Sequence, residues 1–154
     1  MYDRTVIHGE FELERIFSSS PSEVFAAFAD RAIRSVWFGG SGSDYELDFR
    51  VGGRESLTLK LHADGPTYTF DATYHDIVPD QRIVYTYDMY RDDTRISVSL
   101  ATVELLPEDT GTHLILIEYG AFINGYDKPE LREEGINNVF DELGTVLGGT
   151  MSDE

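Results

Sequence analysis

The sequence predicts an α+β fold in which a curved antiparallel sheet wraps around one long helix near the C-terminal end. Six runs that alternate apolar and polar residues follow one another between residues 45 and 121, and this is the pattern of strands with one buried face. Short turns join these runs, so consecutive strands are expected to be antiparallel. Apolar residues then recur at helical spacing over residues 128–147, which provides a long helix to cover the sheet.

The first strand is expected over residues 5–17, where glutamates alternate with larger apolar residues. Phe11, Leu13 and Phe17 fall on one side of this strand. Arg15 has the same parity, so we expect its side chain to point inward.

Two short helices are expected next, each with a capping residue. In "SSSPSEVFAAFAD", Ser20 is the N-cap, Pro21 takes the first helical position and Glu23 completes a capping box. Asp30 can cap a second helix. The expected buried face of that helix consists of Ile33, Val36 and Trp37.

The stretch "FRVGGRESL" predicts a β-hairpin between residues 45–51 and 57–61. Both Gly52 and Gly53 can adopt a positive φ, as a two-residue turn of this kind requires. After it, strands are expected over residues 67–78, 82–90, 95–106 and 111–121.

The long helix is predicted to be capped by Asp127 and to end at Gly148 and Gly149. Residues 128–147 would span about 30 Å, enough to cross a whole sheet. Its apolar residues are Leu131, Ile136, Val139, Phe140, Leu143, Val146 and Leu147.

Composition narrows the function classes. The chain has 154 residues, which predicts a single domain over 1–154. With 12 basic and 29 acidic residues the net charge is −17, so nucleic acids and anionic membranes are expected to be repelled. Cysteine is absent, which excludes disulfides and thiolate metal sites and fits a cytoplasmic protein. No apolar stretch reaches the roughly 20 residues of a membrane-spanning helix.

No metal or cofactor is expected from the four histidines. No two of them have the i, i+4 spacing of a helical metal site. His62, His75 and His113 lie opposite the apolar residues of their strands, so they are expected to face outward.

Glu118 is the first candidate for a ligand-binding or catalytic role. It shares its parity with Leu114 and Leu116, so it is expected to point inward. A carboxylate in an apolar interior either has a raised pKa or lies beside a cation, for which Arg15 is the candidate. The pair could anchor a ligand or act as acid and base. The alternatives are a structural ion pair and an exposed strand end.

Aromatic residues form the second candidate group. Trp37, Phe70, Tyr74, Tyr85 and Tyr87 are expected to point inward, where they could stack on an aromatic ligand or simply fill the interior. On the opposite side of the last strand Ile115 and Ile117 are also apolar, so this strand is expected either to be covered on both sides or to contact a second subunit in a homodimer.

The order of these elements resembles the START-like (SRPBCC) helix-grip superfamily. Within it, the chain is most similar to the family of heat-shock-protein ATPase activator homologues (AHSA-like). The matching pieces are "RIFSSSPSEVFAAFAD", Trp37, "FRVGGRESL", "DIVPDQRIVYTY", "GTHLILIEYGAF" and "LREEGINNVFDELGTVL". They extend over nearly the entire chain.

The resemblance implies a cavity between sheet and long helix that binds apolar small molecules or, in a minority of members, carries catalysis. Helix residues Ile136 and Phe140 then join the aromatic set as ligand-binding candidates. Many relatives carry a tryptophan after the glycine that matches Gly135, where this chain has Ile136, and often a histidine in place of Glu118. The eukaryotic namesake is a co-chaperone with an additional N-terminal domain that this chain does not resemble.

Three functions follow as alternatives. The favoured one is a binding protein for a small apolar, lipid-like or aromatic molecule, without an assembled catalytic set. The second is a cyclase- or hydrolase-like enzyme in which Glu118 acts as acid or base with Arg15 or a tyrosine. The third is an interaction module in stress response, either dimeric or in contact with a chaperone. The last contact is expected less, since the namesake's N-terminal domain has no counterpart in this sequence.

Overall fold

The computed structural model describes residues 5–39, 44–60, 62–148 and 150–152. Their elements are, in chain order, β1 (Val6–Phe17), α1 (Pro21–Ala29), α2 (Arg31–Trp37), β2 (Asp44–Leu47), β3 (Arg54–Lys60), β4 (Thr67–Val78), β5 (Arg82–Arg91), β6 (Thr94–Glu108), β7 (Gly111–Ile123), α3 (Pro129–Val146) and β8 (Thr150–Ser152).

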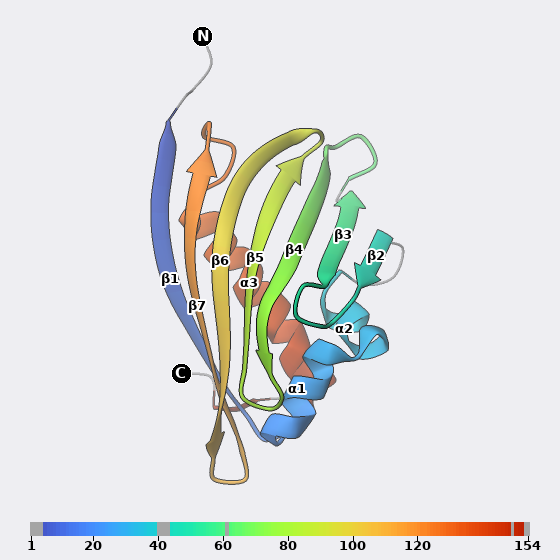
Figure 1. Ribbon diagram of the computed structural model, residues 1–154, viewed down its shortest axis with the longest axis vertical. Coiled ribbons are helices and arrows are strands. Elements are labelled where there is room, and N and C mark those ends of the chain that lie inside the picture. Colours follow the sequence, from blue (N-terminus) through green and yellow to red (C-terminus); the bar gives the residue numbers. More distant parts are fainter. Residues whose placement is uncertain (1–4, 40–43, 61, 149, 153–154) are drawn as a thin grey trace.

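The strands form one eight-stranded sheet in the order β2-β3-β4-β5-β6-β7-β1-β8, and every pairing in it is antiparallel. Figure 1 shows α3 running diagonally across one face of this sheet, with α1 and α2 beside one end of the central strands. Backbone contacts bring α3 close to β1 at one side and to α2 at the other. The predicted α+β helix-grip architecture is confirmed. Among the described helices, none is long and apolar enough to cross a membrane.

The register of β1 against β7 determines which inward side chains of the two strands are neighbours beneath α3. The register places Phe11 opposite Glu118 and Arg15 opposite Leu114. First and last long strands are therefore neighbours, as expected, although they are separated by most of the sequence.

The caps predicted for the two short helices are both present. The Ser20 hydroxyl accepts a hydrogen bond from the Glu23 amide, and the Glu23 carboxylate accepts one from the Ser20 amide. Asp30 accepts hydrogen bonds from the amides of Ala32 and Ile33 at the start of α2. These contacts satisfy amides that have no partner within the helix.

The predicted inward face of α2 is wrong in one respect. Val36 is 63% exposed, whereas Arg34 is buried with only 4% of its surface exposed. Arg34 and Trp37, three residues apart, form the inward face together with the partly buried Ile33. The apolar pattern failed because a charged residue takes a core position, where a carboxylate on β3 neutralises it.

The connection between β2 and β3 also differs from its prediction. Strand β2 ends at Leu47 and β3 begins at Arg54, so the loop is six residues long rather than two. Of the two glycines only Gly52 has a positive φ, 85°. Gly53 is instead needed because the backbone of Asp48 passes close to it: a Cβ at residue 53 would lie 2.1 Å from the Asp48 carbonyl oxygen.

The start of α3 is a third correction. Its N-cap is Lys128, which makes no side-chain capping hydrogen bond, and the helix begins at Pro129. Asp127 instead accepts a hydrogen bond from the Lys128 amide and pairs with Arg132. Gly148 has a φ of 92° beyond the helix end, and the unpredicted β8 then pairs with the end of β1.

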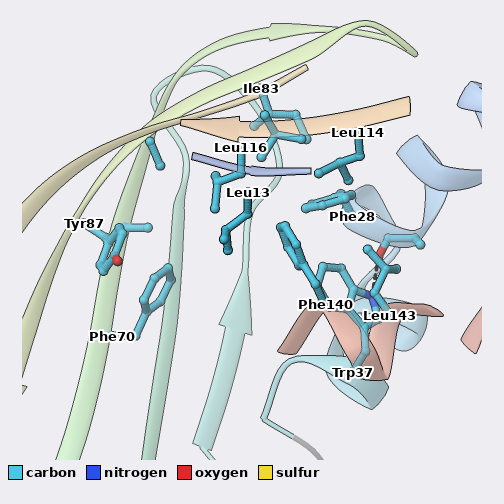
Figure 2. Packing of buried hydrophobic residues seen from close by; sticks show 14 of the residues in the cluster. Leu13, Phe28, Trp37, Phe70, Ile83, Tyr87, Leu114, Leu116, Phe140 and Leu143 are labelled. Atoms are coloured by element: carbon cyan, nitrogen blue, oxygen red, sulfur yellow. Dashed lines mark hydrogen bonds between the residues drawn. The ribbon is translucent and has the colours of Figure 1, made fainter. Parts of the chain in front are cut away.

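A buried apolar cluster joins the sheet to the helices. Figure 2 shows Leu13, Leu114 and Leu116 on the strands near Phe28 of α1 and Phe140 of α3. The Trp37 indole nitrogen donates to the Ala27 carbonyl oxygen at 3.0 Å, which fastens α2 to α1. This packing holds α3 against one end of the sheet.

Gly9 of β1 allows the N-terminal end of α3 to approach the sheet closely. We expect Gly9→Ala to lower the free energy of unfolding by about 1–3 kcal/mol, the usual range for overpacking, because a Cβ there would lie 2.3 Å from Pro129 Cγ. Urea unfolding would measure the change. Gly135→Ala is the control: its Cβ meets only Arg132 Nη2 at 3.4 Å, and alanine is about 1 kcal/mol better than glycine within a helix. Equal effects of the two substitutions would contradict this account of Gly9.

Candidate functional site

A cavity of about 350 Å³ lies between the sheet and α3. Side chains from α1, α2, α3 and strands β3 to β7 line it. Tyr126 and Leu131, both about half exposed, border it at the N-terminal end of α3. We therefore place the mouth of the cavity at this end.

Aromatic rings from the end of α2 and from β4 and β5 form a continuous wall of the cavity. The Phe38 ring packs edge-on against Phe70 with centroids 4.9 Å apart, and Phe70 lies 4.7 Å from Tyr87. Tyr85 extends this wall, at 6.1 Å from Tyr87. Figure 2 shows Phe70 and Tyr87 side by side on neighbouring strands. Such a surface suits the flat face of an aromatic ligand or an alkyl chain.

Glu118 lines this cavity from β7 and is 2% exposed. The Tyr87 hydroxyl donates to Glu118 Oε1 at 2.8 Å, while Oε2 is buried and has no hydrogen-bond partner among the described residues. Burial raises the pKa of Glu118 to about 7, although the Tyr87 hydrogen bond and the charge of Arg132 act in the opposite direction. The carboxyl therefore gains or loses a proton near neutral pH.

Arg132 of α3 lines the same cavity, near its mouth. Its Nε lies 3.3 Å from Asp127 Oδ2. Tyr87, Asp127 and Glu118 raise the pKa of Arg132 against the opposing effect of burial, so it stays protonated. Arg132 and Asp127 form a local ion pair beside the more deeply buried Glu118.

The predicted proximity of Arg15 to Glu118 is wrong. Arg15 donates to Asn137 Oδ1 at 2.9 Å and pairs with Asp141 at 3.2 Å, both on α3. In the β1–β7 register it lies four residues along the strand from Phe11, which is the residue opposite Glu118. Inward parity was right, but parity alone does not set the position along a strand.

A second buried polar cluster was missed by sequence reasoning. Arg34 Nε and Nη2 donate to the two oxygens of Glu55 at 2.7 and 2.9 Å. Tyr45 and Tyr74 donate to the same carboxylate at 2.5 and 3.0 Å. Burial, with the negative charge of Glu55, raises the pKa of both tyrosines. The parity that Glu55 shares with Leu57 on β3 would have indicated an inward carboxylate.

The structure brings together most of the predicted ligand-binding residues. Those that line the cavity are Trp37, Phe70, Tyr85, Tyr87, Glu118, Ile136 and Phe140. Tyr74 is not among the lining residues; its hydroxyl donates to Glu55 at 3.0 Å. Arg34 and Arg132 line the cavity without having been predicted.

Comparisons with known proteins agree with this architecture. Residues 18–148 match the family described as activator of Hsp90 ATPase homolog 1-like protein. The Mll3558 protein from Rhizobium loti is 44% identical, with a TM-score of 0.88 over 93% of this chain and 99% of that one. A protein from Rhizobium leguminosarum is 36% identical, with a TM-score of 0.88 over 94% and 97% of the two chains.

The AHSA1 protein from Silicibacter pomeroyi is more distant, at 25% identity and a TM-score of 0.70 over 91% of this chain and 98% of that one. No curated relative matches the sequence. Since the family match extends over most of the chain, the chain belongs to the activator of Hsp90 ATPase homolog 1-like family.

Proposed function

We propose that the protein binds a small apolar or aromatic molecule in the cavity beneath α3. The observation that carries the proposal is a cavity of about 350 Å³ with an aromatic wall and a buried carboxyl oxygen that accepts no hydrogen bond from the described part of the chain. Small-molecule sites typically enclose about 300–1,000 Å³, with apolar walls and a few polar groups that orient the ligand. An apolar body would lie along Phe70 and Tyr87, with a polar group turned toward Glu118.

A second candidate function is acid–base catalysis at Glu118. A carboxyl with a pKa of about 7 can both accept and donate a proton at neutral pH. Arg15 is too far along β1 to take part, so Tyr87 is the neighbour that could assist. The two functions differ in one measurable respect: Glu118→Gln would abolish turnover of a substrate, whereas it would leave the binding of an uncharged apolar ligand intact.

The binding proposal is tested with N-phenyl-1-naphthylamine, an uncharged dye that fluoresces more strongly in apolar cavities. We expect saturable binding by the wild-type chain and at least a tenfold loss of affinity in Ile136→Trp. Ile136 lines the cavity, and an indole ring there would occupy space that the ligand needs. Fluorescence titration measures the dissociation constants.

Asn138→Trp is the matched control, because Asn138 lies on α3, is exposed and does not line the cavity. It should bind the dye as the wild type does, and both variants should unfold cooperatively. Absence of saturable binding in the wild type would contradict the proposed function. Equal binding by Ile136→Trp and the wild type would place the dye outside this cavity.

A further inference from the structure

The charged groups around the cavity are not balanced. Arg34, Glu118, Asp127 and Arg132 are its acidic and basic lining residues. Arg34 is neutralised by Glu55, with which it makes two hydrogen bonds, and Arg132 lies beside Asp127. Glu118 is left without an ion pair to any described residue; its one hydrogen bond comes from the uncharged hydroxyl of Tyr87.

We propose that the ligand is an apolar organic cation, an ammonium group on an aromatic or alkyl body, whose N–H donates to Glu118 Oε2. The inference rests on the proposed function and specifies the chemistry of its ligand. An ammonium group would supply both things that the carboxylate lacks, a hydrogen-bond donor for Oε2 and a positive charge.

The walls of the cavity also favour a cation. Phe70 and Tyr85 flank Tyr87 with ring centroids 4.7 and 6.1 Å from it, whereas the Phe38 ring is already occupied by the Arg34 guanidinium at 3.9 Å. Ring faces carry partial negative charge and attract cations within about 6 Å, most strongly where water is excluded. At long range, the net charge of −17 attracts cations and repels anions.

The titratable groups that face Glu118 come from two elements. Tyr85 and Tyr87 on β5 are uncharged at neutral pH, since burial raises the pKa of both hydroxyls. Arg132 on α3 is the one cation among the described residues that acts on the Glu118 pKa. Its Nε lies 3.3 Å from Asp127 Oδ2 but makes no hydrogen bond to any described residue. Beside Glu118 in the sheet lie the uncharged residues Phe11 and Ala101. Arg132 therefore offers an alternative, attraction of an anion, which the experiment separates.

The test uses three ligands with one body and different head groups: 4-phenylbutylamine, 4-phenylbutan-1-ol and 4-phenylbutyrate. Each competes with N-phenyl-1-naphthylamine at pH 8, where Glu118 is mostly ionised. We expect the amine to bind at least tenfold more tightly than the alcohol, and the butyrate to bind most weakly. Between pH 6 and pH 8 the amine's affinity should rise about tenfold, since it binds the ionised carboxyl and its own pKa lies near that of lysine.

Glu118→Gln should reduce the amine's affinity to that of the alcohol and remove its dependence on pH. Glu12→Gln makes the same change at an exposed position on β1 and should leave both properties unchanged. Tighter binding of the butyrate, or equal binding of amine and alcohol by the wild type, would overturn the proposed cation while leaving the binding function standing. If neither the dye nor any of the three compounds binds, the proposed function fails as well.

Discussion

Replacing Arg34 with methionine is expected to lower the free energy of unfolding by about 3–5 kcal/mol. Arg34 and Glu55 are both almost fully buried, and each guanidinium–carboxylate contact is shorter than 3 Å. Without the guanidinium, Glu55 would keep two tyrosine donors but lose its counter-charge in an apolar interior. An unpaired buried charge costs far more than a lost surface contact.

Urea unfolding of Arg34→Met and of Arg54→Met measures this effect against a matched control. Arg54 neighbours Glu55 on β3 and pairs with Asp71 at an exposed site. Loss of an exposed pair typically costs less than about 1 kcal/mol. Similar losses in the two variants would contradict the view that the Arg34–Glu55 pair is held away from water.

The free energy of unfolding of Glu118→Gln is expected to increase relative to that of the wild type as pH rises. The increase over the whole titration of Glu118 is roughly 3 kcal/mol. The folded state holds the Glu118 proton up to a pKa of about 7, while the ordinary pKa is 4.5. Between these values the folded state binds more protons than the unfolded one, so the Glu118 contribution to stability falls as pH rises. Glutamine has no such charge to bury.

Most of this change falls between pH 5 and pH 8. Proteins are least soluble near their pI, which is about 4.4 for this chain, so the measurement avoids that region. Urea unfolding across that range gives the difference between Glu118→Gln and the wild type at each pH. Other carboxyl groups titrate in both proteins and cancel in this difference. Glu12→Gln, which alters an exposed glutamate, should show a difference that hardly varies. A constant difference for Glu118→Gln as well would show that the carboxyl is solvated.

Much of the architecture could be predicted because it depends on local patterns. The capping box at Ser20 and the cap at Asp30 are short-range signals, and both are present. Strand periodicity placed Glu118, Tyr85 and Tyr87 on the inward face, which is where they lie. Period-two alternation leaves little freedom here, since a shift by one residue would expose the whole apolar set.

Two local predictions failed, the two-residue turn after β2 and the Asp127 cap of α3. At the candidate site, the failures concern contacts between distant segments. Whether Arg15 lies near Glu118 depends on the register of β1 against β7, which parity does not determine. Arg34 and Glu55 are 21 residues apart, and although strand parity could have placed Glu55 inward, it could not have identified Arg34 as its partner. Tyr74 has the parity of a cavity residue, but its hydroxyl is engaged by Glu55. A pattern can say which side of a strand a residue occupies, but not which partner it meets.

The cavity itself belongs to the same group of long-range properties. The aromatic residues of β4 and β5 could have filled the space beneath α3, and the sequence alone left both outcomes open. The structure shows α3 held at β1 and at α2, with about 350 Å³ left between them and the sheet. The angle of a helix across a sheet depends on many contacts together, among them the close approach of Pro129 to Gly9.

The most direct test of the binding site is the set of nuclear Overhauser contacts between bound 4-phenylbutan-1-ol and the protein. The cavity predicts contacts from the ligand's ring protons to Phe70 and Tyr87 on the sheet and to Ile136 on α3. Contacts instead to Leu100 and Tyr119, which are exposed on the opposite face of the sheet, would contradict a binding site beneath α3.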